Sequence, residues 1–261
     1  MIKTPPARDQ RFSTTLAHGL QLLCSFRVGE VALGNRQFAD RTGLSKATVS
    51  RLTYTLAELG FLKLDLELRK YRLGAAALSV SYPLLAALRI RQAARPLMRE
   101  LANASKGSVS LGMRDRTQMV YVETSRGHHA LTFRPDIGAS LPIVQSAMGR
   151  AWAAQASAIE ASALQAQIRS VDPAGWATFG ARFRRSVRGF RAHGFCVSLG
   201  DWRSEVHAVA VPLRVPVEGE TLVFNCGVTA LQLGRRSIED DIGPRLVAMT
   251  RAVERLIEPA R

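Results

Sequence analysis

The 261-residue sequence has few of the features expected of a membrane-spanning or secreted protein. Its only cysteines are Cys24, Cys196 and Cys226, which argues against a disulfide framework and for a reducing compartment. No apolar run is long enough to cross a bilayer, and residues 1–15 lack the apolar core of a secretory signal. We therefore expect a soluble, cytoplasmic protein without a membrane partner.

Motifs that hold metals or phosphates are also missing. Cys196, His207 and Cys226 match no compact zinc spacing, and each lies in a predicted strand where a thiol or ring can pack. No glycine-rich phosphate loop occurs, and His128-His129 lies in a predicted turn. The sequence therefore predicts no metal, no cofactor and no catalytic residue, and hence a protein that is not an enzyme.

Acidic residues are scarce beside basic ones, since 36 Lys and Arg face 21 Asp and Glu for a formal net charge of +15. A basic protein attracts polyanions, which favours nucleic acid as a partner. Residues 1–75 carry 12 basic and 6 acidic residues, and the remainder carries 24 and 15. The excess is spread along the chain, so charge supports DNA binding without locating it.

The stretch 35–60 has the pattern of a helix-turn-helix. Phe38 lies on a short first helix, Gly43 suits a sharp helix exit, and Ser45 is a good N-cap for the second helix. Helical spacing gives that second helix one apolar stripe, Val49, Leu52, Leu56 and Leu59. Its other face carries residue types that contact phosphates and bases, Lys46, Thr48, Ser50, Arg51 and Tyr54. An ordinary helical hairpin fits this pattern equally well.

The flanking segments complete a winged helix. Residues 1–12 are expected to be a disordered leader, and apolar residues at helical spacing predict a first helix over 13–27, namely Leu16, Leu20, Leu23 and Phe26. Alternating residues at 62–66 and 70–73 predict a basic hairpin after the helix-turn-helix. We expect this DNA-binding domain to span residues 13–74.

Residues 75–106 are predicted to form a helical linker. Residues 75–88 are apolar and alanine-rich, with Pro83 expected to break or kink the helix, and residues 90–104 continue with helical periodicity. This apolar character is too broad for a solitary exposed connector, so we expect the linker to pack against a second copy of the chain.

Residues 107–261 have the pattern of a mixed sheet flanked by helices. Strands are predicted at 108–113, 118–123, 129–133, 194–199, 206–213 and 221–228, with a loop at 138–142. Helices are predicted from Ser146, over 158–169 and 177–193, and over 237–257. The arginines of 182–191 lie opposite an apolar stripe, which favours a solvated outer face over an anion-binding one. The fold class is α+β, with a ligand-sensing second domain.

The ordered motifs resemble the IclR family of bacterial transcription regulators. The matching segments are TGLSKATVSRLTYTLAELGFL, KYRLG, MVYVE, SAMGRAWAA, GF-x-V and VHAVAVPL. This resemblance implies a winged helix, a linker helix and a GAF-like mixed α/β effector-binding domain. It also implies homodimers or homotetramers that bind palindromic double-stranded operators, more often as repressors. A small organic effector of a catabolic pathway, typically a carboxylic or aromatic acid, would control them.

The resemblance also assigns DNA-contacting positions. The exposed face of the family's recognition helix corresponds to Ser45, Lys46, Thr48, Ser50, Arg51 and Tyr54, and the wing corresponds to Lys70 and Arg72. Arg36, at the start of the preceding helix, is a further phosphate candidate. Ser50 stands where many members have histidine, so base preference does not transfer.

The effector site implied by the resemblance lies between the sheet and the start of a helix. Its candidates are Ala147, Met148, Gly149, Ser198, Asp201, Ala208, Phe224 and Cys226. Amides at a helix N-terminus suit a carboxylate. Phe224 and Cys226 share one face of a strand and stand where the family often has Ser-x-Ser, which predicts a less polar effector or a partly filled pocket.

Two other function classes stay open at this point. An enzyme acting on a small organic acid, with an appended nucleic-acid-binding module, would need a convergent set of acid, base or nucleophile. Asp201, His207 and Ser146 are too dispersed in the sequence to propose one. A sequence-neutral nucleic-acid binder driven by the +15 charge is the second alternative.

Overall fold

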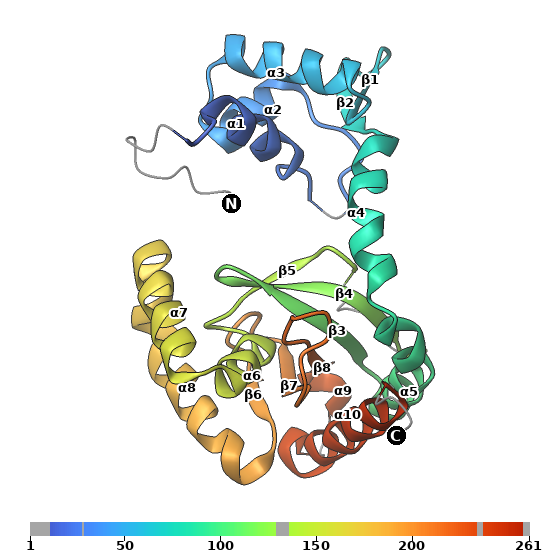
Figure 1. The fold of residues 1–261 in the computed structure, drawn as a ribbon, viewed down its shortest axis with the longest axis vertical. Coiled ribbons are helices and arrows are strands. Elements are labelled where there is room, and N and C mark those ends of the chain that lie inside the picture. Colours follow the sequence, from blue (N-terminus) through green and yellow to red (C-terminus); the bar gives the residue numbers. More distant parts are fainter. Residues whose placement is uncertain (1–10, 28, 129–135, 234–236, 258–261) are drawn as a thin grey trace. The chain divides into compact units, whose positions relative to one another are not determined.

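The chain forms two compact units, Met1–Ala87 and Leu88–Arg261 (Figure 1). The computed structural model describes residues 11–27, 29–128, 136–233 and 237–257. Among those residues, no helix has the length and apolar character needed to span a bilayer. The division between the units falls inside the predicted 75–106 linker, and the exact domain limits stay predictions.

The described residues of the N-terminal unit form four helices and a hairpin. In chain order they are α1 (Thr14–Leu23), α2 (Asn35–Thr42), α3 (Lys46–Glu58), β1 (Leu62–Asp65), β2 (Lys70–Leu73) and α4 (Ala75–Ala87). The core consists of Leu22, Leu33, Phe38, Val49 and Leu52. Leu33 also exchanges two backbone hydrogen bonds with Tyr71, which attaches the hairpin to the segment before α2. This arrangement is the winged helix-turn-helix that the sequence predicts.

Local chemistry fixes the turn between α2 and α3. Gly43 ends α2 at φ 73°, a left-handed conformation that glycine adopts without a steric penalty. Ser45 then caps α3, since its Oγ accepts the Thr48 amide at 3.2 Å. The apolar stripe of α3 is shorter than predicted, because Leu59 is the exposed C-cap residue.

The first helix differs from its prediction in length and orientation. It ends at Leu23 rather than at residue 27, and its buried positions include Ala17 and Leu22. Leu16 and Leu20, which the periodicity placed on the core stripe, are exposed. The predicted apolar stripe therefore lies on the wrong face of α1. Leucines occur on both sides of this helix, so their spacing alone does not identify the buried face.

An ion pair that the sequence did not reveal holds the connection between α1 and α2. Arg41 Nη1 and Nη2 each donate to the Glu30 carboxylate at 2.6 Å, and Nη1 also donates to the Ser25 carbonyl at 2.7 Å. This Arg41 hydrogen bond is the main cause that lowers the pKa of Glu30 to about 2.

Helix α4 is apolar, yet none of its 13 residues is buried. Pro83 lies inside it and does not end it, so of the two expected outcomes, a break or a kink, the break is wrong. The exposed side chains include Leu78, Val80, Tyr82 and Leu84.

The C-terminal unit is built on a six-stranded sheet of order β5-β4-β3-β8-β7-β6. The strands are β3 (Ser108–Asp115), β4 (Gln118–Arg126), β5 (Ser140–Pro142), β6 (Cys196–Leu199), β7 (Val206–Pro212) and β8 (Val223–Thr229). All described neighbours pair antiparallel, so the strands do not form the mixed sheet that the pattern suggested. Within the predicted 138–142 loop, β5 pairs with β4 as an edge strand. The strand predicted at 129–133 lies outside the described residues.

Helices cover both faces of this sheet (Figure 1). One face packs against α5 (Ile90–Ser105) and α10 (Gly243–Ile257), which follows the π-helical turn η1 (Ile238–Ile242). The other packs against α6 (Ala147–Gln155), followed outward by α7 (Ala158–Val171) and α8 (Pro173–His193). A short helix, α9 (Ala230–Leu233), follows β8. Pro96 lies inside α5, and α8 starts four residues earlier than predicted because Asp172 caps it.

Candidate functional site

One face of α3 is open to solvent and carries the predicted DNA-contacting residues. Lys46, Ser50, Arg51 and Tyr54 are exposed, and Tyr54 keeps 64 % of its accessible surface. Val49, Leu52 and Thr53 are buried on the opposite side and fix the rotation of the helix. Thr48 is half-buried, with its hydroxyl 2.9 Å from Ser45 Oγ, so these two side chains satisfy each other at the N-terminus.

The cations of this face keep their charge available. In the described part of the chain, Arg36, Lys46 and Arg51 have no ion-pair partner. Guanidinium and ammonium groups in this state can bind phosphates or the acceptor atoms of guanine.

The wing candidates are less available than those of α3. Arg72 donates twice to Asp65, from Nη2 at 2.7 Å and from Nε at 3.0 Å. Hydrogen bonds from the Leu68 amide and from Arg72 lower the pKa of Asp65, which holds this carboxylate in its charged form. Lys70 is half-buried, and its Cγ lies close to Gly34.

A small cavity of about 20 Å³ lies between the sheet and the N-terminus of α6 in the C-terminal unit. That volume accommodates a water molecule but not an organic acid. Five strands, α6 and one loop line it through Tyr121, Leu141, Ser146, Ala147, Ser198, Trp202, Val206, Ala208, Asn225 and Gly227. We call it the effector cavity.

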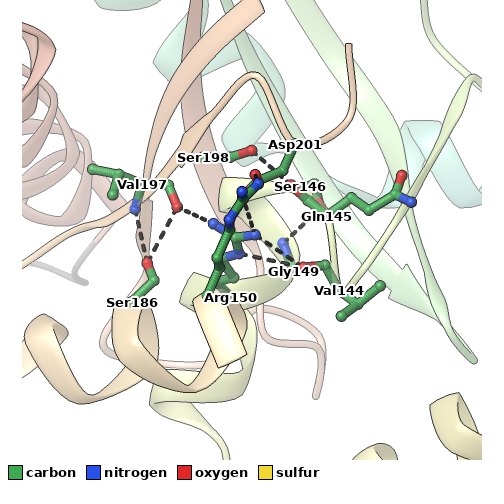
Figure 2. Close-up of polar contacts among 10 residues, drawn as sticks. Val144, Gln145, Ser146, Gly149, Arg150, Ser186, Val197, Ser198 and Asp201 are labelled. Carbon is green, nitrogen blue, oxygen red and sulfur yellow. Dashed lines mark hydrogen bonds and ion pairs between the residues drawn. The ribbon is translucent and has the colours of Figure 1, made fainter. Parts of the chain in front are cut away.

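The α6 N-terminus supplies donors beside this cavity. Ser146 Oγ accepts the Gly149 amide at 3.1 Å, and Ser198 Oγ donates to the Gln145 carbonyl at 2.6 Å (Figure 2). The amides of Ala147 and Met148 have no acceptor among the described residues. Free amides at a helix N-terminus favour an anion, because the helix dipole adds to their own partial charge.

Two polar atoms in the wall of the effector cavity are buried and unpaired. Tyr121 Oη and Asn225 Oδ1 each lack a hydrogen bond of ordinary geometry within the described structure, although the Asn225 side chain lies close enough to Tyr121 to lower its pKa. Burial raises the pKa of Tyr121, so its phenol stays neutral. An unpaired buried carbonyl or hydroxyl costs about 1–3 kcal/mol, so a ligand that pairs with it regains that energy.

Apart from Asp201, the predicted effector residues divide into three groups. Ala147, Ser198 and Ala208 line the effector cavity. Met148 and Gly149 do not line it, because Met148 packs on Gly112 of β3 and Gly149 packs closely on the Ile143 backbone. The expectation for Phe224 and Cys226 is wrong. These two share a face, but it is the face toward α5, where Cys226 Sγ donates to Ser105 Oγ at 3.5 Å. Asn225 occupies the cavity side instead.

Asp201 is buried in an ion-pair network and does not line the effector cavity. Its Oδ2 lies 2.5 Å from Nη2 of Arg150, and its Oδ1 lies 2.5 Å from Nη1 of Arg182. Arg150 also donates to the Val197 carbonyl at 2.7 Å and to the Val144 carbonyl (Figure 2). Burial is the main cause that lowers the pKa of Arg150, and Asp201 opposes it.

This network joins α6 to the loop after β6, which carries the cavity residue Trp202. The Arg203 guanidinium stacks on the Trp202 ring at 4.6 Å. Sequence reasoning did not identify Arg150, because its partner Asp201 lies 51 positions away.

No metal centre is visible in the described part of the chain, where no three His, Cys, Asp or Glu side chains converge on one point. Burial raises the pKa of Cys196 to about 12, so this thiol stays protonated.

Comparison with known proteins matches both units to described families. The IclR helix-turn-helix domain matches residues 15–66, and the bacterial transcriptional regulator IclR C-terminal domain matches residues 83–252. The HTH-type transcriptional regulator TsaQ1/TsaQ2 of Comamonas testosteroni is 32% identical over 267 residues, covering 100% of this chain and 95% of that protein.

Solved structures agree with these matches. An IclR family transcriptional regulator from Brucella abortus superposes with a TM-score of 0.82 at 40% identity, covering 98% of this chain and 96% of that one. An IclR homolog from Microbacterium hydrocarbonoxydans, complexed with 4-hydroxybenzoate, has the same fold with a TM-score of 0.67 at 20% identity. It covers 92% of this chain and 100% of its own.

Proposed function

The chain belongs to the IclR family of bacterial transcription regulators, and from that premise we propose an effector-controlled repressor that acts as a homo-oligomer on a palindromic operator. Its place of action is the cytoplasm. The open, unpaired cationic face of α3 is the observation that carries the proposal.

Helix α3 is the recognition helix in this proposal. Arg51 and Lys46 contact bases and phosphates, while Ser50 and Tyr54 lie between them on the same face. Arg36 supplies a phosphate contact from the start of α2, and Arg72 a weaker one from the wing because Asp65 competes for it.

Helix α4 supports assembly of two chains. An apolar helix without a buried residue is unstable in water as a free surface, and a second copy would cover Leu78, Tyr82 and Leu84. Two recognition helices related by a two-fold axis would then meet half-sites about one helical turn apart, or a multiple of it.

The effector cavity supports a hydroxylated aromatic acid as the signal. A carboxylate would bind at the free amides of Ala147 and Met148, and a hydroxyl would donate to Asn225 Oδ1. The 4-hydroxybenzoate in the Microbacterium homolog has both groups. With Asn225 and Tyr121 on the wall instead of Phe224 and Cys226, the less polar effector is no longer favoured. The cavity must widen on binding, and Trp202 lies on the loop that would move.

DNA binding can be tested by fluorescence anisotropy with the DNA upstream of the protein's own gene. We expect Arg51→Ala to weaken specific binding by about 1–3 kcal/mol, the usual effect of losing a bidentate base contact. Arg255→Ala, which also removes one exposed arginine but from α10, serves as the charge-matched control and should bind as wild type does. Equal affinity for random DNA, or an unchanged Arg51→Ala variant, would contradict the proposal.

Effector binding can be tested by calorimetry with 4-hydroxybenzoate, benzoate and acetate. We expect 4-hydroxybenzoate to bind more tightly than benzoate by about tenfold, because only it can pair with Asn225. It should also release operator DNA in the anisotropy assay. Tighter binding of acetate than of both aromatic acids would exclude this effector class.

A further inference from the structure

The described C-terminal unit contains a hollow much larger than the effector cavity. A groove of about 480 Å³ follows the free edge of the sheet, between α8, β6 and η1. We call it the edge groove. Its volume is within the range of small-molecule sites, about 300–1,000 Å³. Its lining consists of Arg150, Arg182, Arg185, Ser186, Gly189, His193, Phe195, Val197, Leu199, Asp201 and Glu239.

One wall of the edge groove is apolar. Val197 and Leu199 alternate along β6 and therefore share one of its faces, and Phe195, the residue before this strand, continues the alternation. Ser198, which lines the effector cavity, points to the other face. The two hollows thus use opposite faces of the same strand. Leu199 keeps 49% of its surface exposed, so this wall is accessible to a ligand.

The backbone of β6 argues against a peptide strand as the occupant. The Val197 amide donates to Ser186 Oγ, and the Val197 carbonyl accepts from Arg150 and Ser186. The groups that an added strand would need at the middle of this edge are therefore already bonded. A compact molecule fits this edge better than an extended chain.

The opposite wall is cationic. Helix α8 carries five arginines and no acidic residue over its 21 positions. Both oxygens of Asp201 are taken by Arg150 and Arg182. Arg185 has no ion-pair partner among the described residues, and it reaches the groove from α8. Three arginines face two carboxylates across this hollow, so an anion gains more there than a cation.

We propose that the edge groove is a second ligand site, which binds an organic carboxylate with an apolar body. The carboxylate pairs with Arg185 and with the outer face of Arg182, and the apolar body packs on Leu199 and Phe195. The groove shares Asp201 and Arg150 with the loop that closes the effector cavity, so occupancy of one site is sensed at the other. Binding here does not depend on the DNA-binding role.

The test uses the full-length protein and 2-naphthoate, a fluorescent two-ring carboxylate, with 2-naphthalenemethanol as the uncharged analogue. We expect 2-naphthoate to bind at one site per chain and at least about tenfold more tightly than the alcohol, since hydrogen bonds to charged groups contribute about 1.5–3 kcal/mol. Arg185→Glu should weaken 2-naphthoate by at least the same factor. Arg188→Glu makes an equal charge change at an exposed α8 residue outside the groove. It should alter the affinity for 2-naphthoate by less than about twofold.

Three results would overturn the proposal. If the Arg185→Glu and Arg188→Glu variants lose the same affinity for 2-naphthoate, the ligand responds to the overall positive charge of α8 and does not bind at a specific site. No loss in either variant would place the ligand elsewhere. Loss of 2-naphthoate binding in an Asn225→Leu variant, with Arg185→Glu unaffected, would place it in the effector cavity. Leu199→Ser should weaken 2-naphthoate and the alcohol alike, because it removes part of the shared apolar wall.

Discussion

The recognition face of α3 and the effector cavity are in opposite states. The α3 face is open, and its cations are unpaired in the described structure, so DNA can bind without rearrangement of that helix. The effector cavity is closed to about 20 Å³, and its unpaired polar atoms are shielded from water. A ligand for the cavity must therefore supply the energy that opens it, while DNA meets a surface already arranged.

The largest effect is expected from breaking the ion pair behind the cavity. Asp201→Ala leaves the buried Arg150 uncompensated and should lower the free energy of unfolding by about 3–5 kcal/mol. All three tryptophans, Trp152, Trp176 and Trp202, lie in the C-terminal unit, so denaturant unfolding followed by tryptophan fluorescence reports on that unit alone. Arg150→Met combined with Asp201→Leu removes both charges and should regain most of the loss. If Asp201→Ala lowers the free energy of unfolding by less than about 1 kcal/mol, the Arg150–Asp201 ion pair does not stabilise the loop after β6.

A substitution inside the effector cavity should have a smaller effect, which is opposite in sign for stability and for ligand affinity. Asn225→Leu removes an unpaired buried carbonyl and should raise the free energy of unfolding by about 1 kcal/mol. The same change should weaken 4-hydroxybenzoate by about tenfold, since the acceptor for its hydroxyl is gone. Thermal unfolding and calorimetry measure the two effects. If stability and affinity both fall, Asn225 is a packing residue only.

A third substitution, in the wing, should raise the affinity for DNA. Asp65→Asn frees Arg72 and removes a negative charge from the wing, so affinity for operator DNA should rise by about threefold at low salt. Glu67→Gln, the same charge change two positions along and with no arginine bonded, is the matched control. Anisotropy titrations distinguish them. Equal gains in both variants would mean that Arg72 gains no specific contact when it is released.

The smallest effect concerns acid stability of the N-terminal unit. The folded-state pKa of Glu30 is about 2 against an ordinary 4.5, so the ionised carboxylate favours the fold. This contribution is present above pH 4.5 and is lost as the pH falls toward 2. Glu30→Gln should therefore melt at a lower temperature near neutral pH, and its melting temperature should fall less between pH 5 and pH 2.5 (about these limits). Circular dichroism melts measure this, with Asp40→Asn, an exposed acid of the same unit, as control.

The recognition face could be predicted from the sequence because it belongs to one helix. Val49 and Leu52 are buried as their spacing predicts, and this rotation alone exposes Arg51 and Tyr54. The prediction was wrong where the helix ends, since Leu59 is in the C-cap and exposed. Alternation along β8 showed correctly that Phe224 and Cys226 share a face. It could not show which face, because that depends on whether α5 or α6 packs there.

The effector cavity was only partly predictable. Ser198 and Ala208 reach it because β6 and β7 pair in register at these positions. Tyr121 and Asn225 were not identified, since an unpaired atom can be recognised only when every neighbour is known. The Arg150–Asp201 pair joins residues from two elements, and neither residue stands out in its own segment.

Helix α4 has a consequence for gene dosage. Suppose that two chains must pair through their α4 helices before they can bind both half-sites of an operator. The dimer that binds the operator then forms in proportion to the square of the monomer concentration. Halving the number of chains in a cell would then empty the operator by up to about fourfold when monomers predominate. If the proposed pairing of α4 helices holds, the apolar helix would thus make operator binding depend on the copy number of the protein as well as on the proposed effector.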